Sequence, residues 1–226
     1  MRIALTGGIA CGKSLVAKFL NELGVQTLDA DDVVHELEAP GGAAVQSIVA
    51  RFGTDVLAPD GGIDRFKLAE IVFTGGSQLV ATAAETAASH TGGSRSCATA
   101  ARRDLEAILH PLVRQRLLDF SINPIPRSPF PVPLVIIPLL FESHFESDYD
   151  IILCVSSTED RQVDRMMRTR GYTREQAEAR LAAQMPVAEK AALADWTIHN
   201  DSTKEKLKAE VQRCVAWLVG RMEKAT

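Results

Sequence analysis

The eight residues from Gly7 to Ser14 constrain the fold more than any other part of the chain. They read Gly-Gly-Ile-Ala-Cys-Gly-Lys-Ser and fit the pattern G-x-x-x-x-G-K-[S/T]. Arg2 to Thr6 reads as a short buried strand, and apolar residues recur at helical spacing from Lys13 to Leu23. Glycines let such a loop curl so that successive N–H groups point at one anion, and the helix N-terminus adds partial positive charge. The pattern therefore predicts a nucleoside triphosphate site in a phosphate-binding loop.

The motif assigns a role to each of its polar residues. Lys13 is expected to reach the β- and γ-phosphates, and the Ser14 hydroxyl to ligate Mg²⁺. The alternative is a glycine-rich turn in which the lysine is merely solvated. This alternative is disfavoured, because a strand directly precedes the motif and a helix directly follows it. The residues predicted to bind ATP here are Gly8, Ile9, Ala10, Cys11, Gly12, Lys13, Ser14 and Leu15.

The rest of the chain alternates apolar runs with helical patterns. Further strands are expected at Val25–Leu28, Leu134–Ile137 and Ile151–Val155, and helices at 104–120, 158–170, 173–184 and 203–222. Continuous apolar runs are typical of parallel strands that helices cover on both sides. The order predicts an α/β fold with a parallel sheet.

Composition excludes several classes of protein. The chain has 226 residues, enough for one domain with its own core, and a net charge of −4, which disfavours nucleic-acid binding. Its most apolar stretch, Pro131–Phe141, contains three prolines and is too short to span a membrane. The four cysteines are far apart, and no signal-peptide pattern begins the chain, which indicates a cytoplasmic protein.

Two aspartates follow the second predicted strand. Asp29 and Asp31 are two apart in an extended segment, so both side chains are expected to enter one pocket, where a carboxylate can orient and deprotonate an acceptor hydroxyl. The alternative is that Asp31 or Asp32 caps the helix that follows. A GTPase is disfavoured, because the chain has neither Asp-x-x-Gly nor Asn-Lys-x-Asp.

Arginines gather between residues 161 and 180. They are either the exposed face of a helical hairpin, since acidic residues lie among them, or a lid that closes over the triphosphate. The segment 74–103 differs in character: 21 of its 30 residues are Ala, Gly, Ser or Thr, and none is aromatic. It cannot bury enough side chain to offset its ordering entropy, so we expect an inserted loop, at most weakly helical around Leu79–Ala88.

Several of these motifs occur together, and in the same order, in one family. The chain resembles the dephospho-coenzyme A kinases over most of its length. The stretches that carry the resemblance are Thr6 to Ser14, Asp29-Ala30-Asp31, Leu105 to Pro111, Ile137 to Glu142, Gln162 to Arg165, Arg180 with Gln184-Met185-Pro186, and Ala194-Asp195 with Ile198 and Asn200.

The resemblance implies the transfer of the γ-phosphoryl group of ATP to the ribose 3′-hydroxyl of dephospho-CoA. It implies a three-layer α/β/α phosphate-loop fold with a five-stranded parallel sheet, a helical acceptor-binding part at 32–120 that carries the insertion 74–103, and a lid at 156–186. Mg²⁺, ATP and dephospho-CoA are the implied ligands, and the expected state is a monomer or a weak homo-oligomer.

The resemblance also implies residue roles. Asp31 is the expected general base, with Lys13 and Arg165 as the other catalytic residues. Arg168, Arg170 and Asn200 join the loop in binding ATP, Ser14 is the metal ligand, and Asp29, Asp31, His110 and Glu142 contact the acceptor. Two of these have simpler alternatives from the sequence alone: His110 closes a helix, and Glu142 caps the segment after the third strand.

Two departures from the family pattern lie in the loop. Ala10 replaces a usual glycine, which is tolerable if its φ stays negative, and Cys11 replaces a common serine. A thiol beside Lys13 at a helix N-terminus is expected to have a lowered pKa and to react readily, with ATP protecting it; the alternative is an inert stand-in for serine. Two other functions also stay open, a nucleoside or nucleotide kinase with another acceptor and an inactive nucleotide-binding regulatory module.

Overall fold

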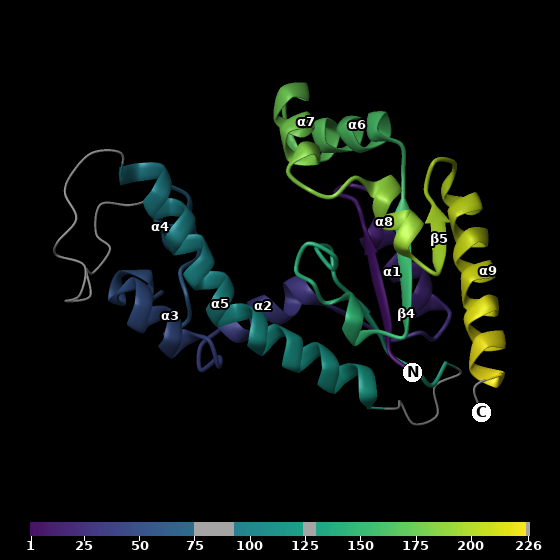
Figure 1. Cartoon of the computed structure of the whole chain (residues 1–226), viewed down its shortest axis with the longest axis horizontal. Coiled ribbons are helices and arrows are strands. Elements are labelled where there is room, and N and C mark those ends of the chain that lie inside the picture. Colours follow the sequence, from purple (N-terminus) through teal and green to yellow (C-terminus); the bar gives the residue numbers. More distant parts are fainter. Residues whose placement is uncertain (75–92, 124–129, 225–226) are drawn as a thin grey trace. The chain divides into compact units, whose positions relative to one another are not determined.

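The computed structural model of the chain describes residues 1–74, 93–123 and 130–224 (Figure 1). Five parallel strands form one sheet in the order β2-β3-β1-β4-β5. Their bounds are β1 Ile3–Gly7, β2 Thr27–Asp29, β3 Leu134–Ile136, β4 Ile151–Ser156 and β5 Trp196–His199. The predicted α/β class and parallel sheet are confirmed.

The central strand is β1, which pairs with β3 on one side and β4 on the other. Ile3 is opposite both Leu134 and Ile151 in the two registers. Every residue of β1 and β3 is buried, as expected for strands that helices cover on both faces. The phosphate-binding loop therefore leaves the sheet at its middle.

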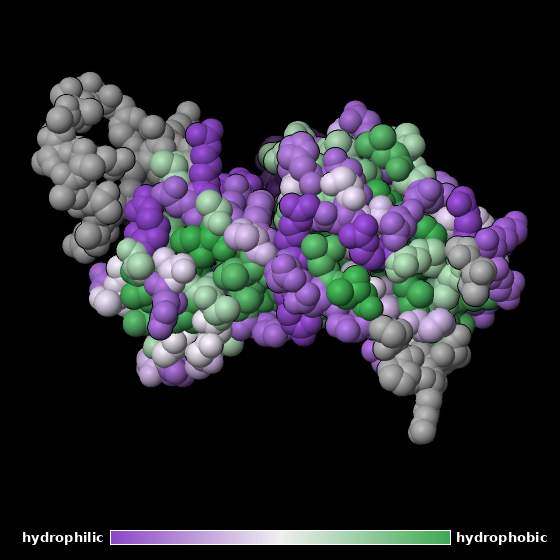
Figure 2. Space-filling model, turned by 60° about the horizontal axis from the view of Figure 1, so that its bottom comes forward, coloured by the Kyte–Doolittle hydropathy of each residue, from purple (hydrophilic) through white to green (hydrophobic). Residues whose placement is uncertain are grey.

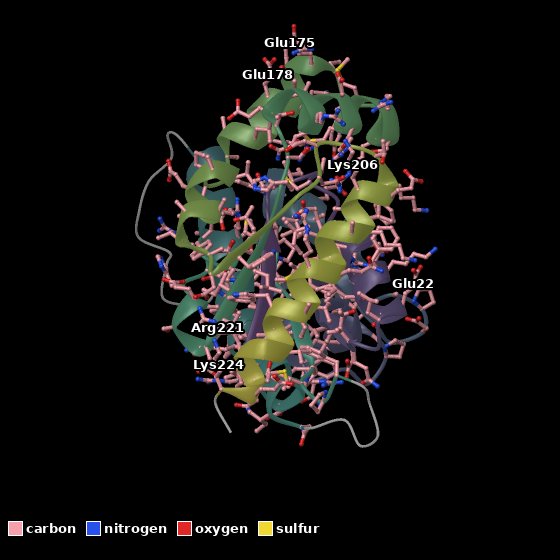
Figure 3. The ribbon with its side chains drawn as sticks, turned by 90° about the vertical axis from the view of Figure 1, so that its right-hand side faces the viewer. Glu22, Glu175, Glu178, Lys206, Arg221 and Lys224 are labelled. Carbon is pink, nitrogen blue, oxygen red and sulfur yellow. The ribbon has the colours of Figure 1, made fainter. Side chains whose placement is uncertain are left out.

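Helices of the first compact unit, which comprises Met1–Ala30 and Leu117–Thr226, surround this sheet. Two of them, α1 and α9, pack against each other, while α8 packs against β1 and β4 (Figure 3). Figure 3 shows α9 along the sheet, with Lys206 near one end and Arg221 and Lys224 near the other. The bounds are α1 Lys13–Glu22, α6 Glu159–Arg170, α7 Arg174–Ala182, α8 Val187–Leu193 and α9 Lys204–Glu223.

A second compact unit comprises Asp31–Arg116. Its helices are α2 Ala30–Glu38, α3 Val45–Phe52, α4 Arg65–Thr74 and α5 Gly93–Ile122, with a 3₁₀ turn η1 at Thr54–Val56. Its own apolar core contains Ile48, Phe52, Val56, Leu68, Val72 and Leu109. This core shares no residue with the core around the sheet.

The helix α5 corrects two expectations. It begins at Gly93, so the interpretation of 74–103 as a loop is wrong for 93–103; residues 75–92, which include Leu79–Ala88, lie outside the described residues. Pro111 lies inside the helix, which continues to Ile122, so His110 does not close it. The exposed Pro111 lacks an N–H, which leaves one backbone acceptor of the preceding turn without its helical donor.

The surface mixes polar and apolar residues. On the face drawn in Figure 2, hydrophilic residues (purple) alternate with hydrophobic ones (green), and neither kind covers the described surface alone. Among the described helices, none has the length and apolar character needed to cross a membrane.

Candidate active site

The carbonyl groups of the loop between β1 and α1 accept hydrogen bonds from side chains of the protein. Lys13 begins α1 and reaches back, so that its ammonium donates to the carbonyls of Gly7 and Gly8, each at 2.9 Å. This lysine is therefore folded back over the loop.

Two amide side chains from distant parts of the chain hold the next carbonyls. Gln162 of α6 donates through Nε2 to the carbonyl of Ile9 at 2.6 Å. Asn200, directly after β5, donates through Nδ2 to the carbonyl of Cys11 at 2.8 Å. Gln162 and Asn200 are both buried, so these bonds are protected from competition by water.

Arg165 holds the carbonyl between them. Its Nη1 donates to the Ala10 carbonyl at 3.1 Å and to the Ser157 hydroxyl at 3.3 Å, and its Nη2 donates to the Asn200 carbonyl at 2.8 Å. The guanidinium thus joins the loop to the ends of β4 and β5. The structure places this predicted catalytic residue at the loop.

A shared consequence follows for the backbone N–H groups. Within one peptide unit the C=O and the following N–H point in opposite directions. Five consecutive carbonyls, from Gly7 to Cys11, accept hydrogen bonds from side chains, and the Gly8 carbonyl also accepts from the Cys11 N–H at 3.3 Å. The carbonyls of Ile9, Ala10 and Cys11 are thus bonded to α6 and to the end of β5, and the N–H groups after Ile9 and Cys11 point away from these partners. Together with the N-terminus of α1, these N–H groups are donors suited to an anion.

Gly8 and Gly12 are required for this geometry by close packing. A Cβ on Gly12 would lie 2.3 Å from Asn200 Nδ2, and Gly12 has a φ of 95°. A Cβ on Gly8 would lie 2.6 Å from Gln162 Nε2 and 3.2 Å from the Cβ of Val187 in α8. The side chains that hold the carbonyls therefore occupy the space that any larger residue would need.

Ala10 departs from its expected conformation. Its φ is 57°, in the left-handed region, so the condition under which the sequence made alanine tolerable here, a negative φ, is not met. A non-glycine residue there costs about 1–2 kcal/mol. Two contacts compensate for this cost: the Ala10 carbonyl accepts from Arg165, and Ile9 and Ala10 pack against a small apolar cluster of α6 and α7, which contains Val163 and Met166.

The expected lowering of the Cys11 pKa is wrong. The residue is fully buried, and this burial raises the pKa of its thiol above the usual range, although the nearby charge of Lys13 acts in the opposite direction. The deprotonated form that reacts is therefore disfavoured. The structure supports the alternative, in which Cys11 is a small buried substitute for serine.

Ser14 and Leu15 lie in the first turn of α1. The Ser14 side chain is exposed, whereas Leu15 is half-buried and packs against the sheet core. The Leu15 N–H donates to the Gly12 carbonyl at 3.0 Å, which closes the first helical turn. A phosphate contact by Leu15 stays a prediction.

The relation expected between Asp29 and Asp31 is wrong. Asp29 is the last residue of β2, but Ala30 already begins α2, so the two aspartates do not lie in one extended segment. The helix begins before Asp31 and Asp32, so neither is its N-cap; both lie in its first turn, where their negative charge stabilises the helix. Asp31 is exposed, as a group that meets a substrate must be.

Glu142 lies in a buried ion pair. Its Oε1 is 2.7 Å from Nζ of Lys190 in α8, and Oε1 also accepts from the Met185 N–H at 3.1 Å. Lys190 is fully buried and also donates to the Pro138 carbonyl at 3.0 Å. This network ties the segment after β3 to Met185, between α7 and α8, and to α8, whose Val187 abuts Gly8. A contact of Glu142 with the acceptor stays a prediction.

The remaining predicted residues lie at the surface. His110 is exposed on α5, and Arg168 and Arg170 are exposed near the end of α6. Arg165 and Arg168 are three residues apart and share one side of the helix, whereas Arg170 is rotated away from them.

Two residues of the site were missed by the sequence analysis. Gln162 lies in a quoted motif, three residues before Arg165, and this spacing places both on one face of a helix. That spacing could have identified it. Lys190 gave no such signal, because a lysine beside a glutamate in a short helix is usually exposed.

Relatives of known family match nearly the whole chain. A model of the family described as "Dephospho-CoA kinase" matches residues 1–83 and 97–206. Dephospho-CoA kinases of Geobacter sulfurreducens and Geobacillus kaustophilus are 39% and 38% identical, over 93% of this chain and 94% and 93% of theirs. The solved dephospho-CoA kinase from Campylobacter jejuni superposes with a TM-score of 0.64 at 24% identity, covering 96% of both chains, which supports the fold. The chain belongs to the dephospho-CoA kinase family.

Proposed function

We propose that the chain transfers the γ-phosphoryl group of ATP to the ribose 3′-hydroxyl of dephospho-CoA, giving CoA and ADP. One observation carries this proposal beyond family membership: every carbonyl of the loop at Gly7–Cys11 is held by a side chain, from Lys13, Gln162, Arg165 or Asn200, at the N-terminus of α1. A preformed donor array stabilises phosphate charge without reorganisation during the reaction.

The first unit supplies the nucleotide site. The loop N–H groups and the start of α1 hold the β- and γ-phosphates, and Lys13 transfers its ammonium from the carbonyls of Gly7 and Gly8 to the phosphate oxygens. Arg165 keeps the loop in shape through Ala10 and Asn200 and adds positive charge beside it. Arg168, on the same side of α6, is the better of the two exposed arginines for covering the triphosphate, and α6 with α7 forms the lid within 156–186.

Ser14 fits a role as the protein ligand of Mg²⁺. Its hydroxyl is exposed at the second position of α1, and oxygen is the ligand that this ion prefers. Among the described residues, no three His, Cys, Asp or Glu side chains form a metal-binding group. The nucleotide and water would supply the other ligands, and the ion would neutralise charge on the phosphates.

The second unit, Asp31–Arg116, supports the assignment of 32–120 to acceptor binding. Asp31 accepts the proton of the ribose 3′-hydroxyl as the oxygen attacks the γ-phosphorus. The new O–P bond forms while the bond to the β,γ-bridging oxygen breaks, and ADP leaves with that electron pair. Asp29, His110 and Glu142 are the further residues proposed to line the acceptor.

One assay tests this proposal. The purified protein with Mg-ATP and dephospho-CoA should produce CoA, and AMP or adenosine should be poor acceptors. Asp31→Asn should lower turnover by about 10²-fold or more and leave ATP affinity unchanged. Efficient phosphorylation of AMP but not of dephospho-CoA would reject the acceptor, and an unchanged rate in Asp31→Asn would reject the base.

A further inference from the structure

One face of α2 carries three ionisable residues in a row. Asp31, His35 and Glu38 are spaced by four and three residues, which places them along one side of the helix. His35 lies about 6 Å and Glu38 about 10 Å along the axis from Asp31, from the rise of an α-helix. All three belong to the second unit, so their relation is fixed within one compact body.

Arg65, the first residue of α4, meets this row. Its Nε lies 3.4 Å from Oε2 of Glu38, and its Nη2 contacts Nε2 of His35. Glu38 is 5% exposed, whereas Arg65 is 54% exposed. A buried carboxylate therefore holds one edge of a guanidinium whose remainder faces solvent.

The contacts leave donors of Arg65 available. A guanidinium has five N–H donors in a planar fork, and the contacts of Arg65 involve only Nε and Nη2. Within the described part of the chain, Nη1 meets no acceptor. Oε2 of Glu38 also has no hydrogen-bond partner there, although it is buried. The guanidinium of Arg65 is thus oriented by Glu38 on one edge and exposed to solvent elsewhere. This arrangement suits the bidentate recognition of a phosphate.

Other arginines of the same unit are placed differently. Arg102 pairs with Glu106, one turn along the same helix, and Arg116 pairs with Glu36. Both of these partner carboxylates are exposed, at 41% and 58%. Arg65 therefore combines an exposed guanidinium with a buried orienting carboxylate on the helix that carries Asp31.

We propose that Arg65, assisted by His35, binds the 5′-diphosphate of the acceptor. This inference rests on the proposed function, because it uses the ribose that Asp31 would deprotonate. The acceptor carries its 3′-hydroxyl and its 5′-diphosphate on the same ribose, so the protein must meet both groups close together. Along α2, the two residues that Arg65 contacts lie about 6 Å (His35) and about 10 Å (Glu38) from Asp31. Glu38 acts behind Arg65 as a positioning residue.

Equilibrium binding separates this role from a merely structural one. Dissociation constants of dephospho-CoA and of adenosine, which lacks the diphosphate, are measured while a non-hydrolysable ATP analogue fills the nucleotide site. Arg65→Met should weaken dephospho-CoA binding by about 10–100-fold, as expected for lost hydrogen bonds to a charged group. Adenosine binding should change by less than about twofold. Arg65→Lys keeps the charge but loses the fork, so an intermediate loss is expected.

The matched control is Arg102→Met, since Arg102 is 60% exposed and also pairs with a glutamate of its own unit. It should leave both dissociation constants unchanged. Equal weakening of dephospho-CoA and adenosine by Arg65→Met, or an unchanged affinity for dephospho-CoA in the folded variant, would overturn the inference. Binding needs no turnover, so a wild-type protein that binds dephospho-CoA without phosphorylating it would contradict the proposed function and leave this inference standing.

Discussion

The side-chain amide of Asn200 donates a 2.8 Å hydrogen bond to the carbonyl of Cys11, across 189 positions of sequence. The end of the last strand is thereby joined to the first loop of the chain. The Asn200 carbonyl in turn accepts from Arg165, which also holds Ala10. One residue thus connects the loop, the helix α6 and the edge strand of the sheet.

Asn200→Ala should loosen the loop. The Cys11 carbonyl would lose a buried donor, which costs about 1–3 kcal/mol of unfolding free energy, and the affinity for ATP should fall with it. Urea unfolding and nucleotide binding measure the two effects. Asn21→Ala is the control, since Asn21 also donates to a backbone carbonyl but is exposed. A loss no greater than in this control would contradict the role of Asn200.

Gly12→Ala should lower the free energy of unfolding by more than the strain of a left-handed backbone alone. The substitution adds a contact of 2.3 Å with Asn200 to the strain of a φ of 95°, for a total of about 2–5 kcal/mol. Gly171 is the matched control: its φ is 67°, but its Cβ would meet no atom within 4 Å. Gly171→Ala should cost only the backbone strain, about 1–2 kcal/mol. Equal destabilisation of the two variants in thermal unfolding would mean that packing against Asn200 is unimportant.

Lys190→Met should destabilise the protein by about 3 kcal/mol, because it leaves Glu142 without its buried partner. Since α8 abuts Gly8 through Val187, ATP affinity should fall as well. Adding Glu142→Gln to Lys190→Met should restore part of the lost stability. The Lys208–Glu22 pair has a similar separation, 2.8 Å against 2.7 Å, but is exposed at 46% and 40%. Breaking it by Lys208→Met should therefore cost much less stability.

Cys11 should be alkylated slowly at neutral pH. Because the pKa of Cys11 is raised, its thiolate forms at a higher pH than the thiolate of an ordinary cysteine. The labelling rate of the folded protein should therefore increase at a higher pH than the labelling rate of the unfolded chain. Mass spectrometry of the tryptic peptide Ile3–Lys13 follows this cysteine separately from the others. Rapid labelling of the folded protein at pH 7 would show that the thiol is accessible.

The sequence predicted the local parts of the site better than its long-range contacts. The path from β1 through the loop into α1 was visible because a motif, an apolar strand and a helical repeat adjoin one another. The short edge strand β5 was not predicted from its residues, since its half-exposed pattern lacks the apolar run of β4. The start of α2 at Ala30 was also missed, because polar Asp29 and Asp31 read equally well as strand end or helix cap.

Side-chain partners could not be predicted for a different reason. Gln162, Lys190 and Asn200 act on atoms 48 to 189 positions away in sequence, and only the folded sheet brings these atoms together. The φ of Ala10 is set by the same distant contacts. Spacing along one chain shows which residues share an element, but it does not show which carbonyl a buried amide will meet.

The long-range contacts of the loop have a consequence for biosynthesis. Since β1 lies at the centre of the sheet, its neighbours β3 and β4 are translated more than 120 residues later, and the donor to Cys11 comes from residue 200. On the ribosome, the apolar strand β1 must therefore wait unpaired until β3 has emerged, and the loop that follows it must wait longer for Asn200. A nascent chain stopped before residue 200 would lack a finished nucleotide cradle, so the ability to hold ATP arrives only as translation ends.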